Sequence, residues 1–158
     1  MRIINADAVS ETMTEEETKD FLANNANNLW MRMGTIDGKG EPNVTVIAFY
    51  FDEPSEKFFV VTGKDSKKVQ HLKNRNIMSY CIDDPNPPYT GVRGKGTVKF
   101  IADIQEIIPL ANKYLTKLTG SLDNQFAKWL MNEIENGKSI ILEITPRYFS
   151  TWRIASTP

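Results

Sequence analysis

The chain has 158 residues, enough for one domain that buries a core without disulfides or structural metals. Its 19 lysines and arginines nearly balance 20 aspartates and glutamates, which argues against nucleic acid as the main partner. The single cysteine, Cys81, excludes an internal disulfide and fits a reducing compartment. The apolar runs are too short to span a bilayer and the N-terminus lacks a signal-peptide block, so we expect a cytoplasmic protein with no membrane partner.

The first third of the chain predicts one helix and one β-hairpin. Thr14 begins a segment with capping-box spacing and an acidic first turn, which favours a helix over residues 14–25. Asp37-Gly38 is a strong hairpin signal between two β-rich runs, Leu29–Ile36 and Asn43–Phe51. The second run is nearly all β-branched or aromatic, so we expect both of its faces to be buried.

The remainder predicts more strands, with helices inserted late. Strands are expected over 57–62, 77–83, 91–101, 139–145 and 149–154, and helices over 66–73, 104–117 and 122–136. There is no regular βαβ alternation. This order favours a mainly β (α+β) fold, an antiparallel sheet closed into a barrel with peripheral helices. We expect one domain over 1–158, with residues 1–13 as a candidate flexible arm at the N-terminus.

The segment Val60–Leu72 is a candidate phosphate site. A β-branched strand runs through Thr62 into a glycine turn and then into a helix that opens with Ser66, Lys67 and Lys68. Helix N-termini carry unpaired N–H groups and partial positive charge, and two lysines there add full charges. The alternative is that the lysine pair is only a solvated surface, and composition alone does not separate the two interpretations.

Other candidates for chemistry are few. One histidine and one cysteine do not supply a usual zinc site, so we expect no metal, and no serine lies in a nucleophile-elbow sequence. His71 is interpreted as a surface histidine. Trp152 and Arg153 near the C-terminus are either capping core residues or a surface that stacks on a planar, negatively charged ligand.

The order of these motifs resembles a known family. A strand is followed by the hairpin Asp-Gly-Lys-Gly-Glu-Pro-Asn-Val-Thr, by Phe-Phe-Val-Val-Thr-Gly, and by Asp-Ser-Lys-Lys-Val-Gln-His-Leu. Gly-Val-Arg-Gly-Lys-Gly-Thr-Val and Ile-Thr-Pro-Arg-Tyr-Phe-Ser-Thr-Trp-Arg come later. Over about residues 14–153 the chain resembles the pyridoxamine 5′-phosphate oxidase-like split β-barrel flavoproteins.

The resemblance implies a homodimer of six-stranded antiparallel split barrels with an FMN in each of two interface clefts. In such proteins two strands line the flavin ring and a helix start binds its phosphate; the matching residues here are Thr45, Val46, Ile47, Val61, Thr62, Ser66, Lys67 and Lys68. Trp152 matches a tryptophan that reaches the flavin from the other subunit.

The departures concern the substrate. The oxidases carry an Arg-x-His pair after that tryptophan, whereas this chain continues Arg153-Ile-Ala-Ser-Thr-Pro. Thr45 and Tyr50 stand where the oxidases carry Arg and Lys. We therefore expect a flavin-dependent oxidoreductase that does not oxidise pyridoxamine phosphate, with its small-molecule substrate and catalytic residues unassigned. A deazaflavin-dependent reductase and a non-enzymatic flavin-binding protein stay open as alternatives.

Overall fold

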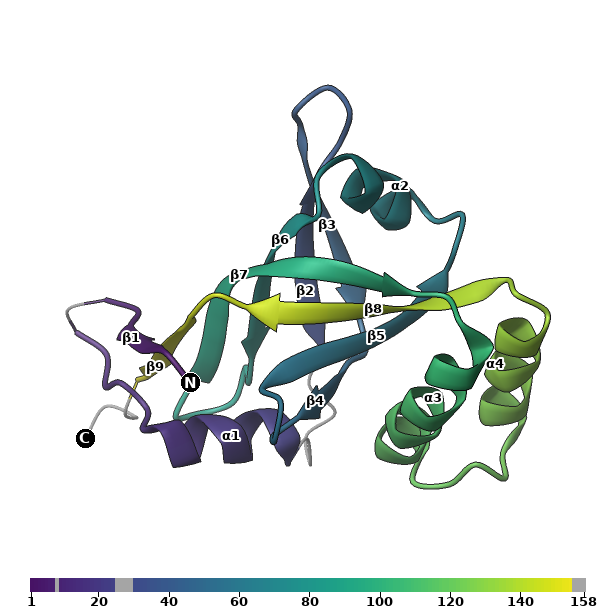
Figure 1. The fold of residues 1–158 in the computed structure, drawn as a ribbon. Helices are drawn as coiled ribbons and strands as arrows, with labels where there is room; N and C mark the ends of the chain where they lie inside the picture. The colour runs from purple at the N-terminus through teal and green to yellow at the C-terminus, as the bar shows by residue number, and fades with distance from the viewer. Residues whose placement is uncertain (8, 25–29, 155–158) are drawn as a thin grey trace.

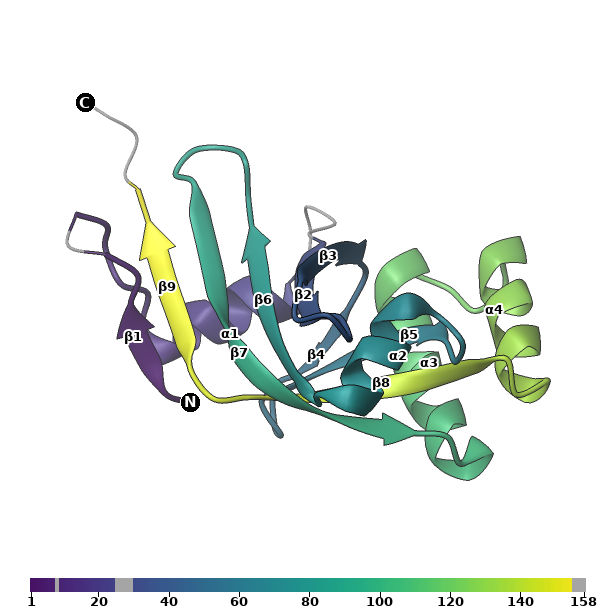
Figure 2. The same cartoon turned by 90° about the horizontal axis from the view of Figure 1, so that it is seen from above.

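A strongly curved, mainly antiparallel sheet organises the protein, and helices pack at its sides (Figure 1). The computed structural model describes residues 1–7, 9–24 and 30–154. In the described part of the chain, no helix is long and apolar enough to cross a membrane. Figure 2 shows α3 and α4 together at one end of the molecule and β1 with β9 at the other.

The predicted helices and strands follow one another in the predicted order, with the unpredicted strand β1 before them and a separate β4 after β3. In chain order they are β1 (Ile3–Asn5), α1 (Glu15–Ala23), β2 (Met31–Ile36), β3 (Pro42–Ile47), β4 (Tyr50–Asp52), β5 (Lys57–Gly63), α2 (Lys67–Asn74), β6 (Ile77–Asp83), β7 (Thr90–Ile101), α3 (Ile104–Thr119), α4 (Gln125–Glu135), β8 (Ser139–Pro146) and β9 (Phe149–Arg153).

The sheet runs in the order β3-β2-β6-β7-β8-β5-β4, with β9 added beside β7 and β1 beside β9. All pairs are antiparallel except β1 with β9, which is parallel. The expected antiparallel split barrel with peripheral helices is confirmed. The number of strands differs, because the short β1, β4 and β9 extend the six long strands to nine within the described residues. β1 lies within residues 1–13, and Met13 is buried there.

Local signals account for several boundaries. Thr14 caps α1 through the expected capping box, in which Glu17 Oε2 accepts from the Thr14 N–H at 2.8 Å. Asp37 Oδ1 accepts from two backbone N–H groups of the β2–β3 turn. The expected end of the first helix at residue 25 and the expected strand start at Leu29 lie outside the described residues.

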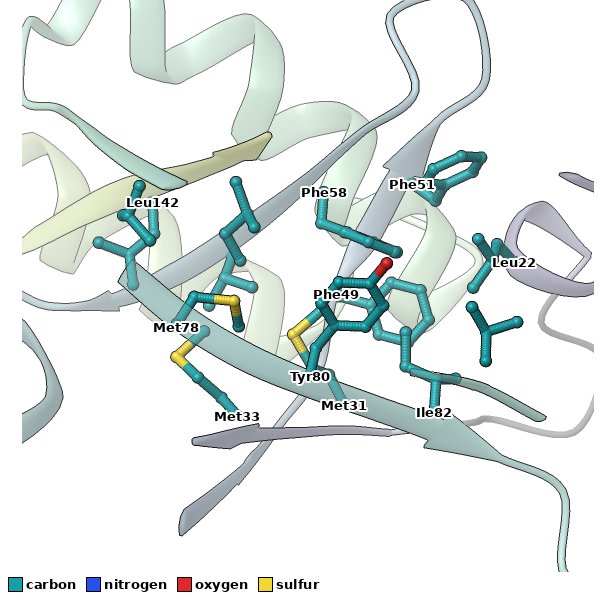
Figure 3. Packing of buried hydrophobic residues seen from close by; sticks show 14 of the residues in the cluster. Leu22, Met31, Met33, Phe49, Phe51, Phe58, Met78, Tyr80, Ile82 and Leu142 are labelled. Atoms are coloured by element: carbon teal, nitrogen blue, oxygen red, sulfur yellow. The ribbon is translucent and has the colours of Figure 1, made fainter. Parts of the chain in front are cut away.

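The barrel core is rich in aromatic and methionine side chains, which point toward one another from several strands (Figure 3). Phe58 lies at its centre, with ring centroids 5.6 Å from Phe49 and 5.1 Å from Tyr80. Val69 and Leu72 of α2 are completely buried in the same cluster. This burial holds α2 against the barrel and so positions the start of that helix.

A second apolar cluster lies on the other side of β5, where α3 and α4 pack. Phe59 and Val61 of β5 contribute to it, whereas Phe58 and Val60 belong to the barrel core. Alternation along β5 therefore sends neighbouring side chains to two different cores, which is why the strand is apolar on both faces.

The prediction of one fully buried strand over Asn43–Phe51 is wrong in two respects. The chain leaves the sheet after Ile47 and returns as β4 at Tyr50. In addition, Val44 and Val46 are 72% and 61% exposed. The sequence pattern indicates a tendency toward burial, but among the described residues nothing covers this face of β3.

Candidate functional site

The start of α2 gathers three hydroxyl or ammonium groups at the end of β5. Ser66 is the N-cap residue, yet its side chain makes no capping hydrogen bond. Its Oγ lies 3.5 Å from Thr62 Oγ1. The first turn of a helix also presents backbone N–H groups without an intrahelical partner. The hydroxyls of Ser66 and Thr62 and the backbone N–H groups of the first turn therefore lie together at the start of α2, where they can donate to a ligand.

Lys68 is the charged member of this group. It is half-buried, and its Nζ donates to Thr62 Oγ1 at 3.1 Å. Burial lowers the pKa of Lys68, and no charged group among the described residues offsets that effect. A half-buried ammonium without a carboxylate is costly unless an anion meets it. Lys67, in contrast, is exposed.

α2 is fixed to the β2–β3 hairpin as well as to the core. His71 Nδ1 lies 3.0 Å from Thr35 Oγ1, and Thr35 is buried in β2. His71 is half-buried, so its interpretation as a simple surface residue is wrong; it links the helix to the hairpin. Thr35 also pairs with Asn43, so this contact brings the first part of β3 close to α2.

The residues proposed to line a flavin ring do not share one face of β3. Thr45 and Ile47 are half-buried and alternate with Val46, which lies on the opposite, exposed face. Within the described residues β3 pairs only with β2, so its other edge is free. A planar ligand that lies along this edge meets the strand backbone, whose N–H and C=O groups point toward the free edge at alternate residues.

Val61 and Thr62 are both buried, at the end of β5 that leads to α2. The side chain of Val61 belongs to the cluster under α3 and α4, so it supports the strand. Thr62 presents its hydroxyl to Ser66 and Lys68. The structure thus brings together Thr62, Ser66 and Lys68, with β3 nearby.

Trp152 lies elsewhere in the same chain. It pairs with Gly91 at the start of β7, and its ring occupies the space where a Cβ of Gly91 would be. The end of α2 lies near Thr97 and Val98, as the hydrogen bond from Val98 N to Asn76 O shows. Gly91 and Thr97 are six residues apart along β7, a separation of roughly 20 Å. Within one chain, therefore, Trp152 does not meet the cluster at the start of α2.

The outer face of β2, β3, β6 and β7 carries cationic and apolar side chains that the sequence analysis did not single out. A cavity of about 740 Å³ lies on it, lined among others by Arg32, Val44, Cys81, Arg93 and Tyr148. Arg32 forms an ion pair with Asp83, and the Arg93 guanidinium lies 6.0 Å from the ring centroid of Trp152. Period-two spacing in Gly-Val-Arg-Gly-Lys-Gly was the signal that places Arg93 and Lys95 on one face.

Another pocket was not expected from the sequence. It has a volume of about 460 Å³ and lies between the residue that begins β4 and one side of α3; its lining residues are Tyr50, Asn112, Lys113, Thr116 and Lys117. The i, i+1, i+4, i+5 spacing of the four helical residues places them on one stripe. That spacing was visible in the sequence, but nothing in it linked the stripe to Tyr50.

Comparisons with known proteins place these features in context. The sequence matches the family model described as pyridoxamine 5′-phosphate oxidase over residues 14–153. No curated protein matches the sequence.

Solved structures share the fold at low sequence identity. A conserved hypothetical protein from Mycobacterium tuberculosis has a TM-score of 0.77 and 17% identity, over 95% of this chain and 90% of that one. A FAD-binding protein from Mesorhizobium loti has a TM-score of 0.69 and 14% identity, over 92% and 97%. A structure described as an F420 reductase has a TM-score of 0.58 and 23% identity, over 78% and 90%. At these identities the likeness concerns the fold.

Proposed function

Because the chain belongs to the pyridoxamine 5′-phosphate oxidase family, we propose that it binds FMN and acts as a flavin-dependent oxidoreductase on a small molecule. The observation that carries the proposal is the half-buried Lys68, which donates to Thr62 beside a Ser66 hydroxyl that does not cap its own helix. The proposed location is the cytoplasm, where Cys81 stays a thiol.

The donor set fits a phosphate monoester. Ser66 and Thr62 supply hydroxyls, Lys68 supplies a charge that no carboxylate of the described residues neutralises, and the first turn of α2 supplies N–H groups. Lys67 adds an exposed charge at the same helix start. Lysine gives charge without the two-pronged hydrogen bonding of arginine, so the hydroxyls and amides supply the directional contacts.

The proposed place for the flavin ring is the free edge of β3, at Thr45, Val46 and Ile47, with Val61 behind the end of β5. Hydrogen bonds from an edge strand fix a planar ring through backbone atoms, whatever the side chains. This explains how residues that point to opposite faces of β3 belong to one site.

A second copy of the chain completes the proposed site. Val44 and Val46 lie exposed on the outer sheet face, and Ile77 on β6 is also 44% exposed. Apolar groups exposed together mark an interaction surface. Trp152 and Arg93 lie too far from Lys68 to meet the same ligand within one chain, whereas a partner copy that covers this face brings its own Trp152 to the cleft.

FMN, when bound, supplies hydride or electron transfer chemistry. The chain then has three tasks: Thr62, Ser66 and Lys68 hold the phosphate, the β3 edge orients the ring, and the partner copy keeps water from the ring face. No side chain is assigned as a proton donor or acceptor.

Absorbance of the purified protein tests the proposal. We expect a flavin spectrum, or uptake of added FMN with quenching of tryptophan fluorescence. Lys67→Ala with Lys68→Ala removes two charge-assisted contacts and should weaken FMN binding by about 3 kcal/mol. Lys73→Ala, an exposed lysine of the same helix, is the matched control and should leave affinity unchanged. A colourless protein that does not take up FMN would refute the proposal.

A deazaflavin is the alternative occupant, since a solved structure with the same fold is described as an F420 reductase. Parallel titrations with FMN and with the deazaflavin, read by tryptophan fluorescence, distinguish the two. A protein that binds FMN tightly but whose bound flavin is not reduced by any donor tested would favour a non-enzymatic carrier or sensor.

A further inference from the structure

One side-chain hydrogen bond joins α2 to the β2–β3 hairpin within the described part of the chain, and the two elements lie side by side (Figure 1). His71 Nδ1 lies 3.0 Å from Thr35 Oγ1. Thr35 is only 3% exposed, so a hydrogen bond lost there is poorly replaced by water. Neither the packing of α2 on the core nor the proposed phosphate contact uses this His71–Thr35 pair.

His71 lies one turn after the lysines that begin α2. It follows Lys68 by three residues and Lys67 by four, and both spacings place side chains next to each other on a helix surface. Lys68 Nζ in turn donates to Thr62 Oγ1. The part of the helix surface that carries the proposed phosphate contact thus continues into the residue that reaches the hairpin.

Thr35 lies close to the part of β3 that is proposed to hold the flavin ring. It stands opposite Asn43, and Met33, two residues earlier on β2, stands opposite Thr45. Residues two apart on a strand lie on the same face, at a separation of roughly 7 Å. One such step along the hairpin therefore leads from the His71–Thr35 pair to Thr45, the first of the proposed ring residues.

The other main attachment of α2 is of a different kind. Val69 and Leu72 are completely buried in the barrel core and hold the helix against it. Burial of apolar groups has no preferred direction, whereas a hydrogen bond needs a short distance and good alignment. The His71–Thr35 pair therefore restricts the position of α2 along the hairpin in a way that the apolar contacts do not.

An electrostatic interaction acts between the same two elements. Hydrogen bonds from the N–H groups of Glu41 and Lys39 hold the pKa of Asp37, in the β2–β3 turn, below its usual value. A positive charge on His71 acts on that pKa in the same direction. The Asp37 carboxylate consequently attracts His71 whenever the imidazole is protonated, which draws the helix toward the hairpin.

We propose that His71 is a positioning residue of the FMN site: through Thr35 it holds the phosphate cluster at the start of α2 in register with the flavin edge of β3. The inference rests on the proposed function for the identity of the ligand. The ring and the phosphate of FMN are joined by one chain, so both ends bind well only when the two parts of the site are held at a matching separation. His71 contacts neither end of the ligand and sets that separation.

Affinities for FMN and for riboflavin, which has the same ring without the phosphate, test this role by fluorescence titration. His71→Leu removes the hydrogen bond and should weaken FMN binding about fivefold, with riboflavin binding unchanged. His71→Asn keeps a polar group and a similar helix propensity, and should bring FMN binding back to within about twofold of the unsubstituted protein. Lys73→Leu, at an exposed position of the same helix, is the matched control and should change neither affinity.

Urea unfolding measures the same hydrogen bond without a flavin. Thr35→Val, His71→Leu and the double variant are compared with the unsubstituted protein. Because both substitutions remove one and the same bond, the loss of stability in the double variant should be smaller than the sum of the two single losses. Additive losses would show that the two side chains do not act together and would overturn the inference.

The outcomes separate this inference from the proposed function. Unchanged FMN affinity in His71→Leu, an equal fall for FMN and riboflavin, or no recovery in His71→Asn overturns the positioning role, while FMN binding by the unsubstituted protein still supports the proposed function. An unsubstituted protein that takes up no FMN refutes the proposed function. The urea measurements then decide by themselves whether His71 and Thr35 join α2 to the hairpin.

Discussion

Lys68 Nζ donates to Thr62 Oγ1 across 3.1 Å, and this hydroxyl is the only partner the described structure gives the Lys68 ammonium. A half-buried cation served by one neutral acceptor is a costly arrangement in the free protein. Such arrangements are retained where a bound ligand stabilises the charge. The same residue then lowers the stability of the free protein and raises its affinity for the ligand.

Lys68→Met should therefore separate stability from affinity. Without FMN, the free energy of unfolding of the variant should exceed that of the unsubstituted protein by about 0.5–1 kcal/mol, because a half-buried charge without an ion-pair partner is removed. Its FMN affinity should fall at least about tenfold. Urea unfolding and a fluorescence titration measure the two effects; equal affinity in both proteins would show that Lys68 does not meet the phosphate.

The lowered pKa of Lys68 predicts a pH dependence with a definite sign. Burial places its folded pKa below the unfolded value of 10.5, so between the two values the unfolded chain binds more protons. The free energy of unfolding of the FMN-free protein should therefore rise with pH within that window, relative to Lys68→Met. FMN affinity should fall as the pH rises through the folded pKa of Lys68, because the ammonium group loses its proton. A pH series of denaturation curves for both proteins provides the check.

Val46→Glu tests the partner surface. Val46 is 61% exposed on the outer sheet face, so the substitution should not disturb the fold of one chain. In a dimer that buries this face the new charge is desolvated, and we expect a monomeric mass by light scattering and weaker FMN binding. Val9→Glu, at a valine that is 94% exposed, is the matched control and should leave the mass unchanged. A natural protein that is already monomeric would refute the shared cleft.

Gly94 is predicted to be intolerant of a side chain. A Cβ there would lie 2.4 Å from Tyr148 O and 2.6 Å from Tyr80 Oη, and Tyr80 Oη itself donates to Tyr148 O at 2.8 Å. Gly94→Ala should lower the free energy of unfolding by roughly 2–3 kcal/mol, because backbone must shift and a buried hydrogen bond is strained.

Gly38→Ala is the control for that measurement, since nothing lies within 4 Å of its Cβ position. It should change the free energy of unfolding by no more than about 0.5 kcal/mol. Thermal or urea denaturation of the two variants side by side decides the matter: similar losses would mean that the glycines matter only for backbone flexibility.

Local patterns were sufficient for most elements. The capping box at Thr14 and the Asp37 turn act between residues close in sequence, and the helix and the hairpin that they predict are present. The start of α2 was likewise visible, because a strand, a glycine and a helix start are consecutive in the chain.

The sequence by itself determined the fold class, the family resemblance and the candidate phosphate residues Thr62, Ser66 and Lys68, since each depends on short-range order along the chain. Only the tertiary structure showed that Val44 and Val46 are exposed among the described residues, that Trp152 lies far from Lys68 in one chain, and that Lys117 and Tyr50 line the same pocket. Those facts depend on which distant segments pack together. The type of a side chain gives a tendency toward burial, but the whole fold determines which segment covers that side chain.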